Sequence, residues 1–205
     1  QVAPGAGATK KVYAESGPAG PVVANALGRW WVFWRTDDGR VACMSSDSHY
    51  HPAPESKRVL KFTSEFAPAV TGDGKYLYLA VVEPGGRVRI WRTANLEHWD
   101  ELPFPEVATL VRPAMVLSGP RLTVAFLRSL GYGIELISSV DPMVKFPAND
   151  EPNVDWGYWK ALGIVSTADG LTMGTADDRI LLLWRDGRNI PEHRGLWGYL
   201  GPAAR

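Results

Sequence analysis

The sequence has little cysteine, no excess charge and no long apolar run. It has one cysteine, Cys43, in 205 residues, which excludes an internal disulfide and a zinc site built from several cysteines. Its 22 basic and 22 acidic side chains give a formal net charge of +0. This balance argues against a nucleic-acid partner, because phosphate binding depends on an excess of Lys and Arg. No run of about 18 apolar residues is present, so we expect no membrane-spanning segment.

Patterns typical of amphipathic helices are also missing. Candidate windows of about 11 residues either contain Pro or Gly or alternate with period two. Charged residues make up only 21% of the chain, whereas aromatic residues make up 11% and include 9 tryptophans. This composition excludes disorder and indicates a packed, aromatic-rich globule. Cys43 lies among apolar neighbours, so we expect a buried and unreactive thiol.

A repeat of 46 residues organises the chain. A basic residue precedes each strongly apolar segment, and the first three, Arg29, Lys75 and Arg121, are 46 residues apart. The fourth, Arg179, follows after 58 residues, which is the same interval with an insertion of 12. We therefore expect four structurally equivalent units, with the insertion forming a loop on one rim.

Each unit is predicted to contain short strands separated by turns rich in Gly, Asp and Pro. The third strands end in Ser or Thr followed by Asp or Asn, and a fourth stretch follows each of the first three. Four-stranded units of this length are typical of β-propeller blades. The sequence thus predicts an all-β fold, a small β-propeller of four four-stranded blades, with five blades as the alternative.

The fourth unit begins at Leu171, and the chain ends before its fourth strand. Residues 10–15 have the right length to supply that strand, and we expect them to close the ring, because an open propeller exposes edge strands. Residues 1–9 then form an N-terminal tail and residues 10–205 a single propeller domain. The small-residue start fits a mature N-terminus left by signal removal, so we expect a secreted or cell-surface protein, although a trimmed chain fits equally well.

The second unit carries the most informative motif. Residues 67–79 read APAVTGDGKYLYL, and residues 90–99 read IWRTANLEHW. This pattern resembles the blade repeat of glycoside hydrolase family 43 and its relatives. It is also similar to sialidase-type propellers and to propeller lectins that bind sugars between blades. The resemblance implies a propeller fold and a carbohydrate ligand.

The resemblance does not extend to the catalytic acids. Family 43 places an acidic residue directly before the Pro of an inner strand, where this chain has Gly20, Ala67 and Arg112. Glycoside hydrolysis needs two carboxyl groups about 5–9.5 Å apart. The nearest catalytic candidates, each displaced from the matching position, are Glu15, Glu65 and Asp169. Whether the chain is an enzyme stays open at this point.

Candidate ligand-binding residues are one arginine and four tryptophans. Arg112 is the one basic residue where an inner strand enters the central funnel, and it could clamp a carboxylate or phosphate or form a rim salt bridge. Tryptophan combines a large apolar face with a polar N–H group. The tryptophans near loops or outer strands are Trp99, Trp156, Trp159 and Trp197. Those on the apolar strands are expected to pack between blades.

No metal and no cofactor is predicted. His49 and His51 have the spacing of two ligands on one strand face, but a solvated loop explains them as well. The favoured hypothesis is a lectin-like propeller that binds carbohydrate without chemistry. The first alternative is a glycoside hydrolase or lyase acting on a polysaccharide with funnel carboxylates. The second is a protein-interaction propeller, one subunit of a larger assembly, and a homo-oligomer or protein partner stays open.

Overall fold

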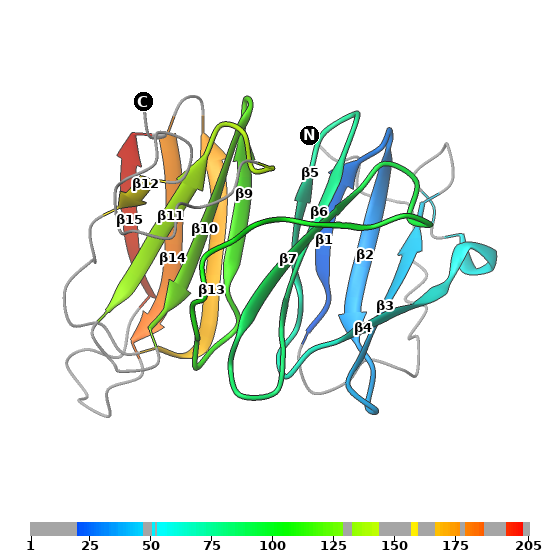
Figure 1. Cartoon of the computed structure of the whole chain (residues 1–205), viewed down its shortest axis with the longest axis horizontal. Helices are drawn as coiled ribbons and strands as arrows, with labels where there is room; N and C mark the ends of the chain where they lie inside the picture. Colours follow the sequence, from blue (N-terminus) through cyan, green and yellow to red (C-terminus); the bar gives the residue numbers. More distant parts are fainter. Residues whose placement is uncertain are drawn as a thin grey trace, which may run out of the picture.

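The computed structural model describes residues 20–46, 51, 53–128, 133–143, 157–159, 167–176, 179–186 and 196–202. Their strands form four antiparallel sheets, three with four strands and one with three (Figure 1). The helical structure within these ranges is one short 3-10 turn, Pro54–Ser56. The all-β prediction is therefore confirmed, as is the division into four units.

The first sheet contains β1 (Val22–Ala26), β2 (Arg29–Arg35), β3 (Arg40–Ser45) and β4 (Arg58–Thr63), in that order. The β1–β2 turn has positive φ at both central residues, 54° at Leu27 and 70° at Gly28. Two such residues make the tight turn that matches the twist of a hairpin, although this conformation is rare for leucine. The Leu27 amide donates to the Asp73 carbonyl at 2.7 Å, which fixes this turn against the second sheet.

The second sheet contains β5 (Ala69–Gly72), β6 (Leu77–Val82), β7 (Val88–Thr93) and β8 (Asp100–Glu101). Its last strand, the fourth stretch expected for this unit, is only two residues long. Pro103 has no N–H group to donate to the neighbouring strand, so regular pairing ends before it. The β6 strand is buried along its whole length, which agrees with its continuous apolar sequence.

The third sheet contains β9 (Ala114–Ser118), β10 (Arg121–Leu127), β11 (Ile134–Ser139) and β12 (Gly157–Trp159). The fourth sheet contains β13 (Thr167–Ala176), β14 (Arg179–Asp186) and β15 (Leu196–Pro202). The described residues contain no fourth strand beside β15. The predicted closing strand at residues 10–15 lies outside the described ranges. Closure of the ring and the tail at residues 1–9 thus stay predictions.

The hydroxyl and Asn or Asp residues after the third strands stabilise the turns that follow. Thr93 Oγ1 accepts hydrogen bonds from the amides of Asn95 and Leu96 at 3.1 and 2.8 Å. In the next unit, Ser139 Oγ accepts from the Asp141 amide at 3.1 Å. Short polar side chains commonly satisfy nearby amides in this way. The repeated motif is therefore a turn-forming device.

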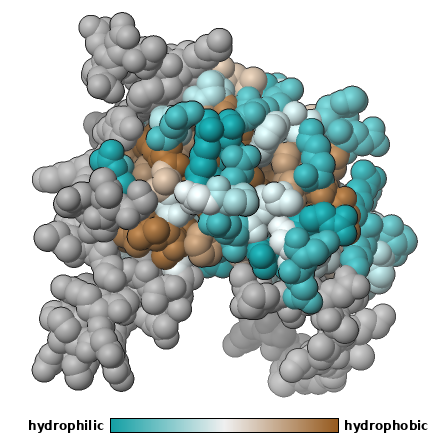
Figure 2. Space-filling view, turned by 60° about the horizontal axis from the view of Figure 1, so that its bottom comes forward, coloured by the Kyte–Doolittle hydropathy of each residue, from teal (hydrophilic) through white to brown (hydrophobic). Residues whose placement is uncertain are grey.

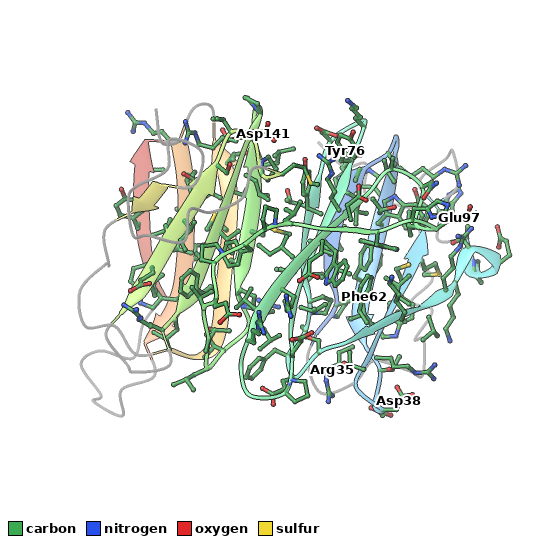
Figure 3. The ribbon with its side chains drawn as sticks, viewed as in Figure 1. Arg35, Asp38, Phe62, Tyr76, Glu97 and Asp141 are labelled. Atoms are coloured by element: carbon green, nitrogen blue, oxygen red, sulfur yellow. The ribbon has the colours of Figure 1, made fainter. Side chains whose placement is uncertain are left out.

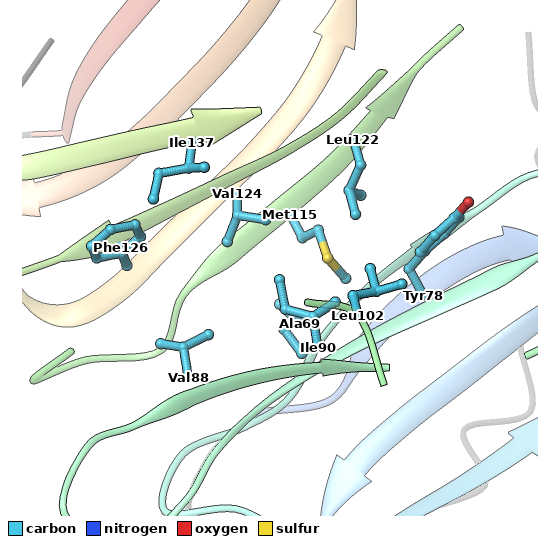
Figure 4. Close-up of a cluster of buried hydrophobic side chains, with 11 residues drawn as sticks. Ala69, Tyr78, Val88, Ile90, Leu102, Met115, Leu122, Val124, Phe126 and Ile137 are labelled. Carbon is cyan, nitrogen blue, oxygen red and sulfur yellow. The ribbon is translucent and has the colours of Figure 1, made fainter. Parts of the chain in front are cut away.

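Among the described residues, three apolar clusters hold neighbouring sheets together. The cluster between the second and third sheets includes Ile90, Leu122, Val124 and Phe126, all with 0% exposure (Figure 4). A second cluster joins the first and second sheets, and a third joins the third and fourth. Side chains from facing strands interdigitate in each, as in packed β-sandwiches.

The two end sheets differ from the two middle sheets in burial. Nearly every residue of β6 and β10 is buried on both faces, whereas β2 alternates between buried and more exposed positions. Apolar side chains on the outer faces are exposed, including Trp30 at 42% and Leu200 at 54%. The apolar second strands are therefore buried on both faces only in the middle two sheets. The face of the molecule seen in Figure 2 shows apolar patches among hydrophilic residues.

The first strands of the sheets lie next to one another in the middle of the molecule. β1 contacts β5, β5 contacts β9, and β9 contacts β13. The outer strands β3 and β4 lie at one end of the view and β15 at the other (Figure 1). This order, with each inner strand contributed by a successive repeat, is the arrangement expected of propeller blades.

Candidate functional site: a cavity between the inner strands

A cavity of about 270 Å³ lies where the four inner strands meet. Every sheet contributes to its wall through equivalent segments, residues 21–23, 68–70, 112–115 and 171–173. The first and fourth sheets thus face one cavity although they are farthest apart in the sequence. A pocket shared by all four units is the natural place for a ligand in this fold.

The repeated proline explains how the chain builds this wall. Pro21, Pro68 and Pro113 each come directly before or at the start of an inner strand, and each lines the cavity. Proline is tolerated at the first residue of a strand, where its missing N–H breaks no ladder bond. The Leu117 amide donates to Thr71 Oγ1 at 3.2 Å, which ties β9 to β5 beside the cavity.

All but two of the described side chains that line the cavity are apolar. The described residues that line it include valine, alanine, proline, leucine and methionine, with Thr172 as the polar residue and Arg112 as the charged one. Such a wall can hold the apolar face of a small ligand, while a few polar groups fix its orientation. The sequence singled out Arg112 but not Thr172, Met115 or Met173. Met115 lies two residues after Pro113, and Thr172 and Met173 occupy the equivalent positions of the fourth unit, which has Leu171 in place of the proline.

Arg112 is half-buried and fixed by the fourth sheet. Its Nη2 group donates to the Leu171 carbonyl and to Thr172 Oγ1, both at 3.3 Å. Its own carbonyl accepts from the Leu171 amide at 3.1 Å. Gly170 has a φ of +94°, and a Cβ there would lie 2.8 Å from the Arg112 Cβ. Glycine at position 170 thus leaves room for the arginine to cross between sheets.

Burial lowers the pKa of the Arg112 guanidinium from its ordinary value, because removal from water disfavours the charged form. Arginine nevertheless stays protonated in proteins. The side chain therefore places a fixed positive charge at an otherwise neutral wall. No ion pair joins it to an acidic side chain within the described ranges.

Of the three catalytic candidates, only Glu65 has a described side chain. Glu65 is exposed in the loop before β5, and its Oε1 accepts a hydrogen bond from the Gly85 amide at 3.2 Å. It is not among the residues lining the cavity. Asp169 lies within β13, but its side chain is outside the description, and Glu15 lies outside the described ranges. Their catalytic roles therefore stay predictions.

Trp99 is packed rather than free at the surface. Its ring meets Phe62 edge-on at a centroid distance of 5.1 Å, and Phe62 lies 5.0 Å from the ring of Trp91. The Trp99 Nε1 group donates to the Leu96 carbonyl at 3.1 Å. Figure 3 shows Phe62 in the body of the molecule, between the ends marked by Asp38 and Tyr76. These contacts give Trp99 a role in joining the first two sheets.

The other candidate tryptophans cannot be placed at the cavity by their side chains. Trp159 and Trp197 belong to β12 and β15 by their backbone, whereas Trp156 lies outside the described ranges. Among the strand tryptophans, Trp31 and Trp184 are buried as predicted, but Trp30 is not. The inter-blade prediction thus holds for part of this set.

Metal and thiol chemistry find little support in the described ranges. They contain no group of three or more His, Cys, Asp or Glu residues placed to hold a metal ion. His51 is described, but its proposed partner His49 is not. Cys43 is fully buried, and this burial raises the pKa of its thiol to about 12, as expected for an unreactive cysteine. No described helix is long and apolar enough to cross a membrane.

The chain resembles known proteins in fold but not in sequence. No protein-family model matches the chain, and no curated protein matches it in sequence. Solved structures do match. The SapL1 lectin in complex with alpha methyl fucoside aligns with a TM-score of 0.65 and 17% identity, over 93% of this chain and 62% of that chain. The lectin's own length is thus only partly spanned.

Two further structures widen the comparison. AofleA from Arthrobotrys oligospora aligns with a TM-score of 0.55 and 10% identity, over 88% of this chain and 53% of that chain. A family 43 glycoside hydrolase from Xanthomonas citri, complexed with xylose, aligns with a TM-score of 0.50 and 12% identity, over 89% of this chain and 67% of that chain. Sialidases also match. The chain therefore has the fold of part of these lectin, sialidase and family 43 structures, the classes of protein that its repeat resembles.

Proposed function

We propose that this chain is a carbohydrate-binding β-propeller that acts without chemistry. The observation that carries the proposal is the cavity shared by all four inner strands, with an apolar wall interrupted by Thr172 and Arg112. Sugar rings have apolar C–H faces and many hydroxyls, so a wall with a few polar groups suits them. The match to the SapL1 lectin supports the same function.

The size of the cavity fits a small ligand. Pockets for drug-sized molecules measure roughly 300–1,000 Å³. This cavity, at about 270 Å³, is below that range and suits a single sugar ring. A terminal or branching residue of a glycan is therefore a better candidate than the interior of a long polysaccharide.

The test is to fill the cavity without disturbing the core. Val23 lines the cavity and is 57% exposed, so Val23→Trp should fold while occupying the ligand space. Val59 is 45% exposed on β4 and lies outside the cavity wall, so Val59→Trp is the matched control. Binding is measured on a glycan array and then by calorimetry with the sugars that bind.

The expected result is sugar binding by the wild type and Val59→Trp, and its loss in Val23→Trp. Absence of any bound sugar on the array would remove the carbohydrate function. Equal binding by Val23→Trp would move the site away from this cavity.

The enzyme alternative is favoured by the fold shared with a family 43 hydrolase. It predicts release of a chromogenic aglycone that is lost in Glu15→Gln, Glu65→Gln or Asp169→Asn. Turnover with that mutational pattern would replace the binding function by hydrolysis.

The proposal extends to the closure of the ring and to the cellular location of the protein. We propose one propeller domain over residues 10–205, with four blades closed by a strand from residues 10–15. The three-stranded fourth sheet supports it, because β15 has a free edge within the described ranges. We also propose a secreted or cell-surface location, where glycans are accessible.

A further inference from the structure

The outer face of the first sheet has the residues of an inter-sheet interface but no partner sheet within the described ranges. Trp30 on β2 is 42% exposed. The strand registers assign it the same position as three residues in the other sheets, Leu77, Leu122 and Ile180. These three are at most 3% exposed. Leu77 and Leu122 lie in clusters that join their sheets to the preceding one, so Trp30 occupies a position that is elsewhere buried against a preceding sheet.

The outer face of the fourth sheet is the counterpart. Leu181 on β14 is 37% exposed, and its neighbour on β15, Leu200, is also exposed. The residues at the position of Leu181 in the other sheets are Trp31, Tyr78 and Thr123, which are at most 8% exposed. Trp31 and Tyr78 lie in clusters that join their sheets to the following one. Leu181 thus occupies a position that is elsewhere buried against a following sheet.

The two outer faces are therefore the two halves of one interface, which we call the seam. Among the described strands, β1 contacts β5, β5 contacts β9 and β9 contacts β13, whereas β1 and β13 share no comparable contact. Burial of apolar side chains favours packing of two such faces against each other. The seam is thus open in this structure, although its faces carry the residue types of a closed interface.

The cavity lies beside the seam. Residues 21–23 of the first sheet and residues 171–173 of the fourth sheet both line it. A molecule that contacts both segments binds more tightly when the two sheets are closer together. Such a difference in affinity between two arrangements shifts the protein toward the one that binds better.

We propose that the ring opens and closes at the seam, and that a sugar held in the cavity favours the closed arrangement. In the closed arrangement Trp30 and Leu181 are buried between the first and fourth sheets, as their equivalents are between the other sheets. In the open arrangement the seam admits the sugar to the cavity. The part played by the sugar rests on the proposed carbohydrate function, whereas the opening itself does not.

Distances between spin labels across the seam test the opening. Cys43 is buried and unreactive, so labels attach only to introduced cysteines. Arg29→Cys with Arg179→Cys places exposed labels at the start of β2 and of β14, one on each side of the seam. Arg29→Cys with Lys75→Cys is the matched control, because an apolar cluster joins the first and second sheets. Double electron–electron resonance on the full chain gives both distance distributions.

Without sugar, we expect a short and a long population across the seam and one narrow population for the control pair. Trimethylamine N-oxide favours burial of apolar surface, so it should increase the short population. Trp30→Glu should remove the short population, because closure would bury an unpaired charge. Leu110→Glu changes an exposed apolar residue that precedes β9 and should have no effect.

The sugar is added as the methyl glycosides of fucose, glucose and galactose, and of any further sugar that binds on the glycan array. A glycoside that binds should shift the seam pair to the short distance and leave the control pair unchanged. Trp30→Glu should weaken its binding by at least about fivefold, although Trp30 does not line the cavity. Calorimetry measures this change.

The outcomes separate the two proposals. A single narrow seam distance that trimethylamine N-oxide does not change overturns the opening, and this comparison needs no Trp30 variant. A short population that appears only at high protein concentration, together with a dimer in light scattering, also overturns it, because a second copy then covers the seam. A bound glycoside that leaves the seam distances unchanged overturns the coupling to the cavity. If no sugar binds, the carbohydrate function fails, while the distances without sugar still decide the opening.

Discussion

At the scale of single residues, the charged side chains of Arg112 and Asp38 lie in two different environments. Arg112 is half-buried with neutral hydrogen-bond partners, whereas Asp38 is exposed in the β2–β3 turn and surrounded by donors. Asp38 accepts hydrogen bonds from Thr36 Oγ1 and from Arg40 Nε, the latter at 2.7 Å. Arg112 thus presents a positive charge at the cavity, whereas the hydrogen bonds to Asp38 stabilise a turn.

The donors around Asp38 predict a pH dependence. Hydrogen bonds from Thr36 and Arg40 lower the pKa of Asp38 from 3.8 to about 2. Because the folded-state pKa is the lower one, the stabilisation is present above the unfolded value and is lost as the pH falls through about 2. NMR titration of the Asp38 carboxyl carbon should show the low value, and Thr36→Val should raise it. A wild-type midpoint near 3.8 would contradict the turn geometry.

The sequence identified Arg112 as a binding candidate but could not predict where the side chains of the acidic candidates lie. The repeat alignment put Arg112 at a strand entry, and the structure puts it at the cavity. Glu65 is only three residues before Pro68 in the sequence, yet its carboxylate bonds to the Gly85 amide. The path of a connecting loop decides where such a side chain points, and composition carries no information about that path.

At the scale of elements, strands were predictable where apolar runs end at glycine turns. β6 and β10 agree with their predicted segments because both faces are buried. The fourth strands were less predictable, since they lie at sheet edges and β8 is only two residues long. Edge strands have few packing constraints, so their sequences carry a weak pattern.

The contact of Trp99 with Phe62 predicts a stability effect without a binding effect. Trp99→Ala should lower the free energy of unfolding by about 2–4 kcal/mol, because it removes a large, partly buried ring between two sheets. Trp99→Phe keeps a ring but loses the N–H donor to Leu96, and should cost about 1 kcal/mol. Urea denaturation measures both. A Trp99→Ala variant with normal stability and lost sugar binding would show that the ring faces a ligand instead.

At the scale of the whole molecule, the fourth sheet raises the question of how the first and last units join. It has three described strands where the others have four. The 46-residue period predicted the number of sheets, because each repeat folds into one unit. The period could not determine how the first and last units join, since that contact lies between non-repeated ends.

Deleting residues 10–15 should therefore lower the melting temperature and promote aggregation, because the edge of β15 would lack its proposed partner. Deleting only residues 1–9 is the control and should change little. Differential scanning calorimetry and light scattering follow the two effects. Equal melting temperatures for both deletions would contradict closure by this segment.

The apolar clusters each connect two neighbouring sheets, and this has a consequence for local unfolding. Coupling that passes only between neighbours resembles a one-dimensional chain of units. In a ring closed by residues 10–15, opening then costs least at the seam between the first and fourth sheets and most in the middle two sheets. The amides of β6 and β10 should exchange with deuterium most slowly, and those of β2 and β14 earlier. The protein is thus expected to loosen from this seam, with the two middle sheets the last part to open.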